Sequence, residues 1–121
     1  MPLARDYLVR DLARDLGLPI VAAASPGLGT TNHTLLTLAA ARSARLRVAA
    51  VVLTPWAAGP FLVERSNRET IERLGGVAVE TLPWLDLTDT GSWPPLGVCE
   101  FEPAVAGLNR QMPPRTAAAT G

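Results

Sequence analysis

Apolar residues along this chain follow two patterns, which predict helices and buried strands in alternation. Over residues 3–16, leucines recur at four-residue spacing opposite charged residues, which predicts an amphipathic helix ending at Gly17. Residues 18–24 are almost wholly apolar. A run of this length is typical of a strand in a parallel sheet, covered on both faces.

The alternation continues as far as residue 82. A second helix is expected from about residue 33 to residue 45, and a second buried strand at residues 48–53. Residues 66–69 (Ser-Asn-Arg-Glu) fit a capping box that opens a third helix. That helix is expected to end at Gly75, and a third, shorter strand to follow at residues 77–82. Such alternation indicates an α/β fold with parallel strands joined by right-handed crossovers.

The regular pattern stops after residue 87, where prolines interrupt the sequence. One short helix is expected at residues 103–110, and residues 116–121 are expected to be disordered. The chain is therefore expected to form one α/β unit at residues 1–90, followed by an irregular, proline-rich tail at residues 91–121.

Composition narrows the classes of partner and compartment. Apolar residues make up 48% of the chain and charged residues 18%, which is typical of a globular protein. Eleven basic residues balance eleven acidic ones, so nothing in the charge favours nucleic acid or an anionic membrane. No apolar run approaches the roughly 18 residues of a membrane helix. Cys99 is the only cysteine, which excludes an intrachain disulfide and fits a reducing cytoplasm.

The loops that follow the three strands are the expected ligand site. In open parallel sheets, ligands bind beyond the carboxyl ends of the strands, which places residues 25–32, 54–60 and 83–87 on one rim. The first of these loops contains glycines and leads into a helix, whose first N–H groups can bind a carboxylate or phosphate. The simpler alternative is a strand-to-helix turn in which Thr31 or Asn32 caps the helix.

Other candidate residues have two possible roles each. His33, the only histidine, could act as a base, although a lone histidine at a helix start more often packs or caps. Trp56 and Trp84 could stack on a nucleobase or pack at the rim of the sheet. Cys99 has no basic neighbour in the sequence, which argues against a reactive thiolate.

The sequence lacks the residues that usually bind and transfer phosphate groups. All eleven basic residues are arginine, and a phosphate-binding P-loop requires a lysine after its glycines. No acidic residue ends a predicted strand in a way that suggests a magnesium ligand. The sequence therefore supplies no catalytic residue for nucleotide chemistry and no metal site.

Residues 27–38 (Gly-Leu-Gly-Thr-Thr-Asn-His-Thr-Leu-Leu-Thr-Leu) closely resemble the G-L-G-T-[IL]-N-H-[TA]-x-L-T motif of dethiobiotin synthetases. The strand ending at Leu53, the segment 66–71 and the Leu-Pro-Trp-Leu at 82–85 resemble later parts of the same family. The resemblance covers about residues 5–90.

The resemblance implies a fold and a reaction. The family is of the P-loop NTPase type, with helices on both sides of a parallel sheet, and this chain resembles its carboxy-terminal half, truncated at the amino terminus. The family uses ATP and Mg²⁺ to close the ureido ring of dethiobiotin from 7,8-diaminononanoate and CO₂, as a homodimer. Its P-loop, lysine and magnesium carboxylates lie in the other half, so the chain alone is expected to be inactive unless a separate half associates with it.

The resemblance also implies two sets of binding residues. The substrate's carboxylate would be bound by Gly29, Thr30, Thr31 and Asn32, which would reach it from the neighbouring subunit of a homodimer. The nucleobase would be bound by Thr54, Pro55, Pro83, Trp84 and Leu85. Two other interpretations of the chain remain open. It could be a fragment of another member of the superfamily, such as a cobyrinate-type amide synthase, or a non-catalytic binding or scaffold remnant.

Overall fold

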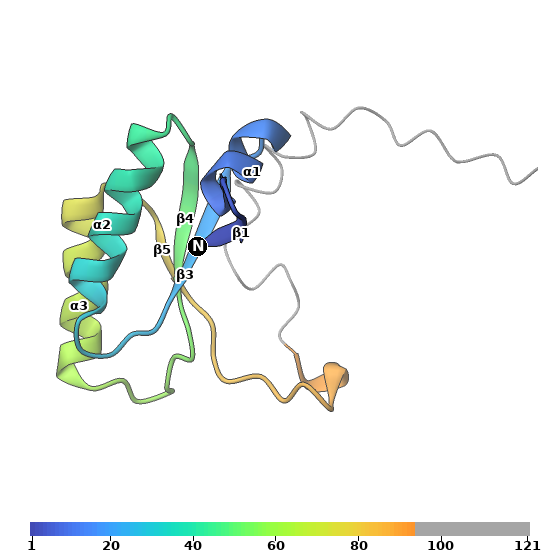
Figure 1. The fold of residues 1–121 in the computed structure, drawn as a ribbon. Coiled ribbons are helices and arrows are strands. Elements are labelled where there is room, and N and C mark those ends of the chain that lie inside the picture. The colour runs from blue at the N-terminus through green and yellow to red at the C-terminus, as the bar shows by residue number, and fades with distance from the viewer. Residues whose placement is uncertain (94–121) are drawn as a thin grey trace, which may run out of the picture.

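The computed structural model describes residues 1–93 of the chain (Figure 1). Most of the expected tail lies outside the described residues. It includes Cys99, the short helix expected at 103–110 and the disorder expected at 116–121. The elements in chain order are β1 (Pro2–Ala4), β2 (Tyr7–Leu8), α1 (Val9–Leu16), β3 (Ile20–Ala24), α2 (Thr30–Ser43), β4 (Val48–Leu53), α3 (Leu62–Gly75), β5 (Val79–Thr81) and the 3₁₀ helix η1 (Thr90–Ser92).

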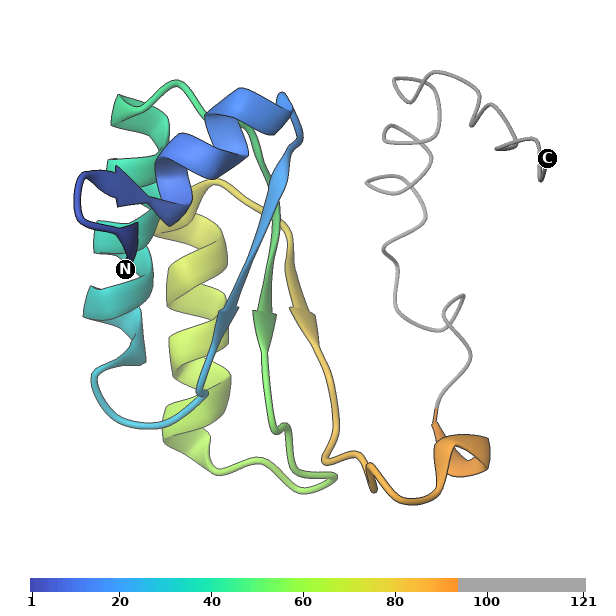
Figure 2. The same cartoon turned by 45° about the vertical axis from the view of Figure 1, so that its right-hand side comes forward.

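The central element is a three-stranded sheet in the order β3-β4-β5, and both strand pairs are parallel. The register pairs Ala22 with Val51, and Val51 in turn with Val79. All three strands run in one direction, so their carboxyl ends share one rim (Figure 2). The α/β fold with a parallel sheet predicted from the sequence is confirmed.

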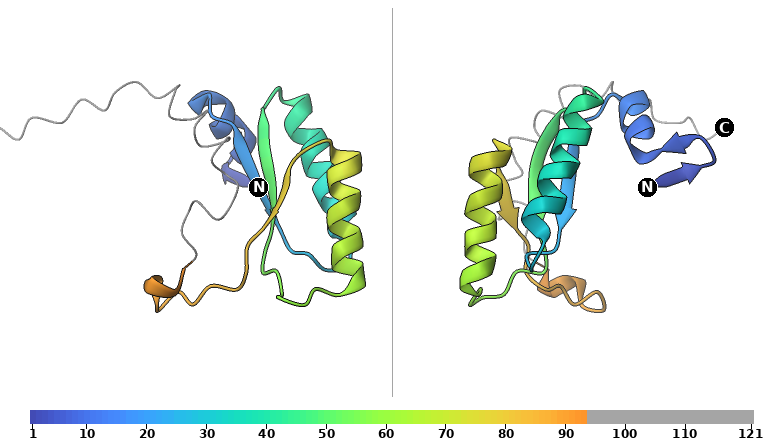
Figure 3. Two further views of the ribbon diagram at one scale, coloured as in Figure 1. Left: turned by 180° about the vertical axis from the view of Figure 1, so that it is seen from behind. Right: turned by 60° about the vertical axis from the view of Figure 1, so that its left-hand side comes forward.

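The two crossover helices cover one face of this sheet. α2 and α3 lie side by side against one face, while α1 and the β1–β2 pair lie on the other side, near the amino ends of the strands (Figures 1 and 3). The guanidinium of Arg42 near the end of α2 donates to the carbonyl oxygen of Gly75, the last residue of α3. The two crossover helices are therefore joined at the end remote from the rim.

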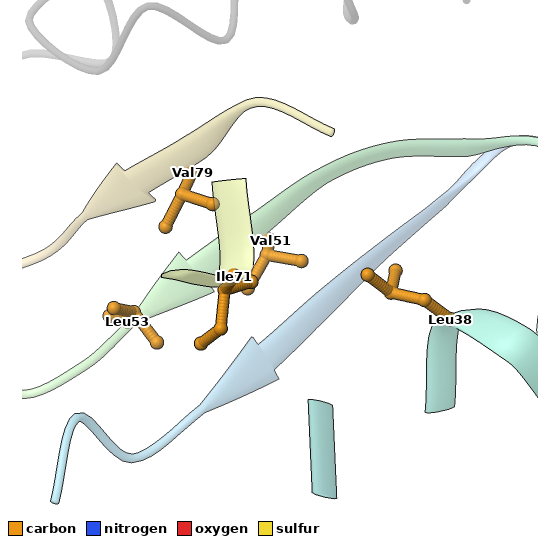
Figure 4. Close-up of a cluster of buried hydrophobic side chains, with 5 residues drawn as sticks. All are labelled: Leu38, Val51, Leu53, Ile71 and Val79. Atoms are coloured by element: carbon orange, nitrogen blue, oxygen red, sulfur yellow. The ribbon is translucent and has the colours of Figure 1, made fainter. Parts of the chain in front are cut away.

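The hydrophobic core lies between the sheet and the two crossover helices. Its fully buried side chains come from α2, α3, β4 and β5 (Figure 4): Leu38, Val51, Leu53, Ile71 and Val79. Burial of aliphatic side chains of this size contributes about 1.5–3 kcal/mol each, so this cluster is the main source of stability in the described unit.

The expectation that every strand is covered on both faces is only partly correct. β4, the central strand, is buried from Ala50 to Leu53. β3 alternates instead, and within residues 1–93 its Val21 side chain is 48% exposed. The sequence of β3 is apolar throughout, but only one of its faces lies against α2.

The first helix is shorter than the predicted span of residues 3–16. Residues 2–8 form the antiparallel β1–β2 pair, and α1 begins at Val9. The Asp11 carboxylate accepts a hydrogen bond from the backbone N–H of Leu8 at 2.8 Å. This bond satisfies a donor at the helix start and so fixes the start of α1 after Leu8. The predicted end is confirmed, since Gly17 is the C-cap with a φ of 65°.

The third helix begins four residues before the predicted capping box. Its N-cap is Phe61, whose backbone N–H donates to the Glu64 carboxylate at 2.7 Å. The capping box expected at residues 66–69 is therefore wrong, and Ser66 lies inside α3. The predicted end at Gly75 is confirmed, with Gly76 as the C-cap in the left-handed conformation. Within residues 1–93, no helix has both the length and the apolar character needed to cross a membrane.

Candidate functional site

The rim at the carboxyl ends of the strands is held together by backbone hydrogen bonds between its loops. Thr54 N–H donates to the Ala24 carbonyl at 2.9 Å, and Leu82 N–H donates to the Leu53 carbonyl at 3.0 Å. Trp56 N–H donates to the Leu82 carbonyl at 2.8 Å. These bonds extend the pairing of the strands into the loops, so the three predicted loops meet in one region.

The loop after β3, residues 25–29, is called the glycine loop below. It ends at Gly29, the N-cap of α2, whose φ of 86° is a left-handed conformation that favours glycine. The Thr30 N–H donates to the Gly27 carbonyl at 3.3 Å, and the His33 N–H donates to the Gly29 carbonyl at 3.2 Å. α2 therefore begins directly at the glycine loop, three residues before its predicted start.

The first turn of α2 presents backbone N–H groups suited to an anion. An α-helix leaves its first N–H groups without intrahelical partners, at the positive end of its dipole. Within residues 1–93, the N–H groups of Thr31 and Asn32 have no backbone carbonyl partner. Gly29 rather than Thr31 or Asn32 is the N-cap, so the alternative capping role of those two residues is wrong.

The side chains of this turn divide into inward and outward sets. Thr30 is 6% exposed, and its Oγ1 lies 3.4 Å from that of the equally buried Thr34. Thr31 donates its hydroxyl proton to Asn67 Oδ1 at 3.0 Å. Asn32 and His33 are exposed, and within the described part of the chain the Asn32 side chain makes no hydrogen bond. Asn32 is thus the free polar side chain beside the unpaired N–H groups.

His33 takes neither a core position nor a capping role through its side chain. Its ring lies beside Gly29, where its Cε1 atom would be 3.8 Å from a Cβ added to that glycine. The ring therefore lies close to the N-cap glycine, and it also lines the hollow beside the glycine loop.

Asn67 is a site residue that sequence reasoning placed in a capping box instead. From α3, its Nδ2 donates to the carbonyl oxygens of Pro26 and Gly27, both at 3.1 Å, and its Oδ1 accepts from Thr31. Asn67 is 41 residues from Pro26 and 40 residues from Gly27 along the chain, so no local sequence pattern predicts these contacts. The only local signal is an asparagine inside a helix, where this residue type is a poor helix former.

A hollow of about 250 Å³ adjoins the glycine loop between β3 and α2. Its lining combines small apolar residues of the strand with hydroxyl and imidazole groups of the helix: Ala22, Ala23, Ala24, Ser25, Leu28, Thr30, His33, Thr34 and Thr37. A short aliphatic chain with a polar end group fits this combination of surfaces.

The residues predicted to bind a nucleobase lie on the neighbouring part of the rim. Thr54 and Pro55 follow β4 and are joined by a cis peptide bond, while Pro83 and Trp84 follow β5 and are exposed. Leu85 is half-buried. These residues form a second loop pair, adjacent to the glycine loop through the bond between Thr54 and Ala24.

The two tryptophans of the rim differ in environment. Trp56 packs against the hydrophobic core, so it has the packing role rather than the stacking role considered from the sequence. Trp84 is 80% exposed, so its indole face is open to a planar ligand. Of the two, Trp84 has the more exposed indole.

The segment after β5 forms a hydrogen-bonded turn. The side chain of Asp86 accepts from the hydroxyl of Thr88 at 2.6 Å and from its backbone N–H at 2.8 Å. These bonds hold the pKa of the Asp86 carboxyl below its usual value. The Trp93 indole N–H donates to the Asp86 carbonyl at 2.7 Å, so the chain folds back on itself just after the predicted nucleobase loop.

Residues that would bind metal-bound phosphates are not gathered at this rim. The 121 residues include no lysine. In the part of the chain that the structure describes, no three His, Cys, Asp or Glu side chains come together as metal ligands. Among residues 1–93, the rim therefore offers backbone N–H groups, hydroxyls and an exposed indole, and no lysine.

Comparison with known proteins relates the chain to one domain family and to several curated enzymes. Residues 1–91 match the AAA domain family. The ATP-dependent dethiobiotin synthetase of Mycolicibacterium vanbaalenii is 37% identical over 101 residues, which are 83% of this chain and 45% of the relative. The dethiobiotin synthetases of Bacillus licheniformis and Bacillus subtilis are 44% and 42% identical over 64% and 65% of the chain. The chain spans less than half the length of these curated relatives.

Proposed function

Because the chain belongs to the AAA domain family over residues 1–91, we propose that it is the carboxy-terminal portion of an ATP-dependent dethiobiotin synthetase. The observation that supports this most is the glycine loop leading into α2, in which unpaired N–H groups stand next to the exposed Asn32. The complete enzyme would close the ureido ring of dethiobiotin from 7,8-diaminononanoate, CO₂ and ATP.

In this proposal the end of the glycine loop and the first turn of α2, residues 29–32, bind the carboxylate of 7,8-diaminononanoate. The backbone N–H groups of Thr31 and Asn32 and the Asn32 amide are the donors. The hollow beside the loop has room for part of the aliphatic chain. A carboxylate at a helix N-terminus is stabilised both by these hydrogen bonds and by the helix dipole.

The second loop pair binds the nucleobase in the same proposal. Backbone groups around Thr54 and Pro55 and those of residues 83–85 would contact the edge of the base, while Trp84 offers an exposed face. ATP phosphates and Mg²⁺ would be bound by residues from outside this chain, since the chain has no lysine. The proposal therefore includes a homodimer, or association with a separate amino-terminal half, in the cytoplasm.

Ligand binding to the isolated chain tests the substrate assignment. In a titration of ¹⁵N-labelled protein with 7,8-diaminononanoate, we expect the amide signals of residues 29–32 to shift. The same diamine without its carboxylate is the matched control ligand and should leave these signals in place. Equal shifts with both ligands, or none with either, would refute the carboxylate site and favour a scaffold or a different substrate.

Turnover by the isolated chain tests the assignment of the phosphate chemistry. With ATP, Mg²⁺, bicarbonate and 7,8-diaminononanoate, the purified chain should form no dethiobiotin, because it has neither a lysine nor a P-loop. The measurement is product detection by mass spectrometry. ATP-dependent product from the chain alone, free of contaminating enzyme, would overturn the proposed division of roles.

A further inference from the structure

The Asn67 side chain connects α3 to the glycine loop through two hydrogen bonds and to the first turn of α2 through a third. Its Nδ2 donates to the carbonyls of Pro26 and Gly27 at 3.1 Å each, and its Oδ1 accepts from the Thr31 hydroxyl at 3.0 Å. Two backbone carbonyls can only accept, so these partners fix which end of the carboxamide faces the loop. No other side chain bridges this loop and α3 within residues 1–93.

The buried Pro26 anchors the start of the glycine loop, but the centre of the loop has little else to determine its shape. Gly27 and Gly29 carry no side chain, and the Leu28 side chain is 97% exposed, so the centre of the loop contributes nothing to the core. The Gly27 carbonyl accepts from Thr30 N–H as well as from Asn67. Within the described residues, Asn67 is therefore the one side chain that ties this stretch of backbone to α3 by hydrogen bonds.

The direction of the Pro26 and Gly27 carbonyls determines which way the neighbouring backbone N–H groups point. In a trans peptide the C=O and the following N–H point to opposite sides. The peptides after Pro26 and Gly27 are trans. Since both carbonyls are turned toward α3, the N–H groups of Gly27 and Leu28 face away from it. Successive N–H groups of this kind form an anion-binding concavity.

We propose that Asn67 is the positioning residue of the carboxylate site. By holding two carbonyl oxygens toward α3, it keeps their partial negative charge away from a bound carboxylate and leaves backbone N–H groups available. This inference rests on the proposed function, because it concerns the geometry of the same site. It also assigns Thr31 a different role from Asn32, since the single hydroxyl proton of Thr31 is donated to Asn67. Thr31 therefore serves the ligand through its backbone N–H.

Four variants of the full chain test this role by NMR. Asn67→Ala removes all three hydrogen bonds, and Thr31→Val removes one. Asn67→Asp keeps the size and the acceptor for Thr31 but offers the carbonyls no donor. Ser66→Ala is the matched control, because Ser66 is the exposed preceding residue of α3.

Two quantities are measured for each variant: the amide shifts of residues 27–32 without ligand, and the Kd for 7,8-diaminononanoate. We expect Asn67→Ala and Asn67→Asp to move the loop amides and to weaken binding at least tenfold. Thr31→Val should have a smaller effect on both, and Ser66→Ala none. If Asn67→Ala does not fold, Asn67→Asp and Thr31→Val carry the test.

The outcomes separate this inference from the proposed function. Loop amides that stay in place in Asn67→Ala and Asn67→Asp, or affinity equal to the wild type, would overturn the positioning role. A wild-type chain that does not bind 7,8-diaminononanoate would refute the proposed substrate instead. In that case the affinity of the same variants for acetate decides the positioning role, with the same expected order.

Discussion

Replacing Asn32 by alanine should separate ligand binding from folding at the start of α2. Asn32 is the third residue of the helix and is exposed, while Gly29 is the N-cap. Within the described residues, its side chain makes no hydrogen bond that folding would need. The substitution therefore removes an amide group proposed to bind the ligand, without removing the cap of the helix.

The two magnitudes follow from this placement. Alanine is the better helix former by less than about 1 kcal/mol, so Asn32→Ala should change the free energy of unfolding by no more than about 0.5 kcal/mol. A hydrogen bond to a charged group contributes about 1.5–3 kcal/mol. Since each 1.4 kcal/mol is about tenfold in affinity, the Kd for 7,8-diaminononanoate should rise roughly ten- to a hundredfold.

Both quantities should be measured on one preparation of the chain. Calorimetric or NMR titration gives the Kd, and thermal unfolding gives the Tm. Leu36→Ala is a suitable control, because Leu36 is 61% exposed about one turn further along α2 and should change neither value. In an assembled enzyme, KM should rise more than kcat falls, since the carboxylate does not take part in the reaction. A lower Tm with unchanged Kd would refute the carboxylate role of Asn32.

Three further substitutions test the fold of the described unit. Gly29→Ala should lower the free energy of unfolding by about 1–2 kcal/mol in urea denaturation, because its φ of 86° strains a side chain; no change would contradict that backbone conformation. Ile71→Ala should cost about 2–5 kcal/mol in the same assay, because Ile71 is fully buried in the core; a cost below 1 kcal/mol would contradict its burial. A hydrogen bond to Asp15 raises the pKa of Tyr7, the only tyrosine, so Asp15→Asn should lower the midpoint of its ultraviolet titration; an unchanged midpoint would contradict this contact.

The parallel α/β architecture was predictable from the sequence because its signals are local. Apolar runs mark the strands, and glycines such as Gly17 and Gly75 mark helix ends, where the structure also has them. The exposure of β3 was not predictable, because its residues are as apolar as those of β4. Which faces of a strand are covered depends on elements elsewhere in the chain.

The starts of the helices and the support of the site were harder to predict. Glu64 and Glu69 both stand three residues after a possible N-cap, and the sequence pattern favoured the wrong one, since a serine at position 66 scores better than Phe61. The glycine loop that leads into α2 was predicted from the sequence, because glycines before a helix mark such a turn; its role as an anion site stays a prediction. Asn67 was not assigned to the loop, because only the packing of α3 beside α2 brings it there.

The edge position of β3 determines what a larger sheet would place around the glycine loop. Within residues 1–93, β3 pairs only with β4 and its other edge is open. Neighbouring strands lie about 4.8 Å apart, so a parallel strand added there would end about 10 Å from the end of β4. That span is close to the reach of a nucleotide from its base to its phosphates. A nucleotide whose base lies after β4 could therefore extend across the end of β3, with its phosphates at the added strand and the substrate's carboxylate loop beneath its middle.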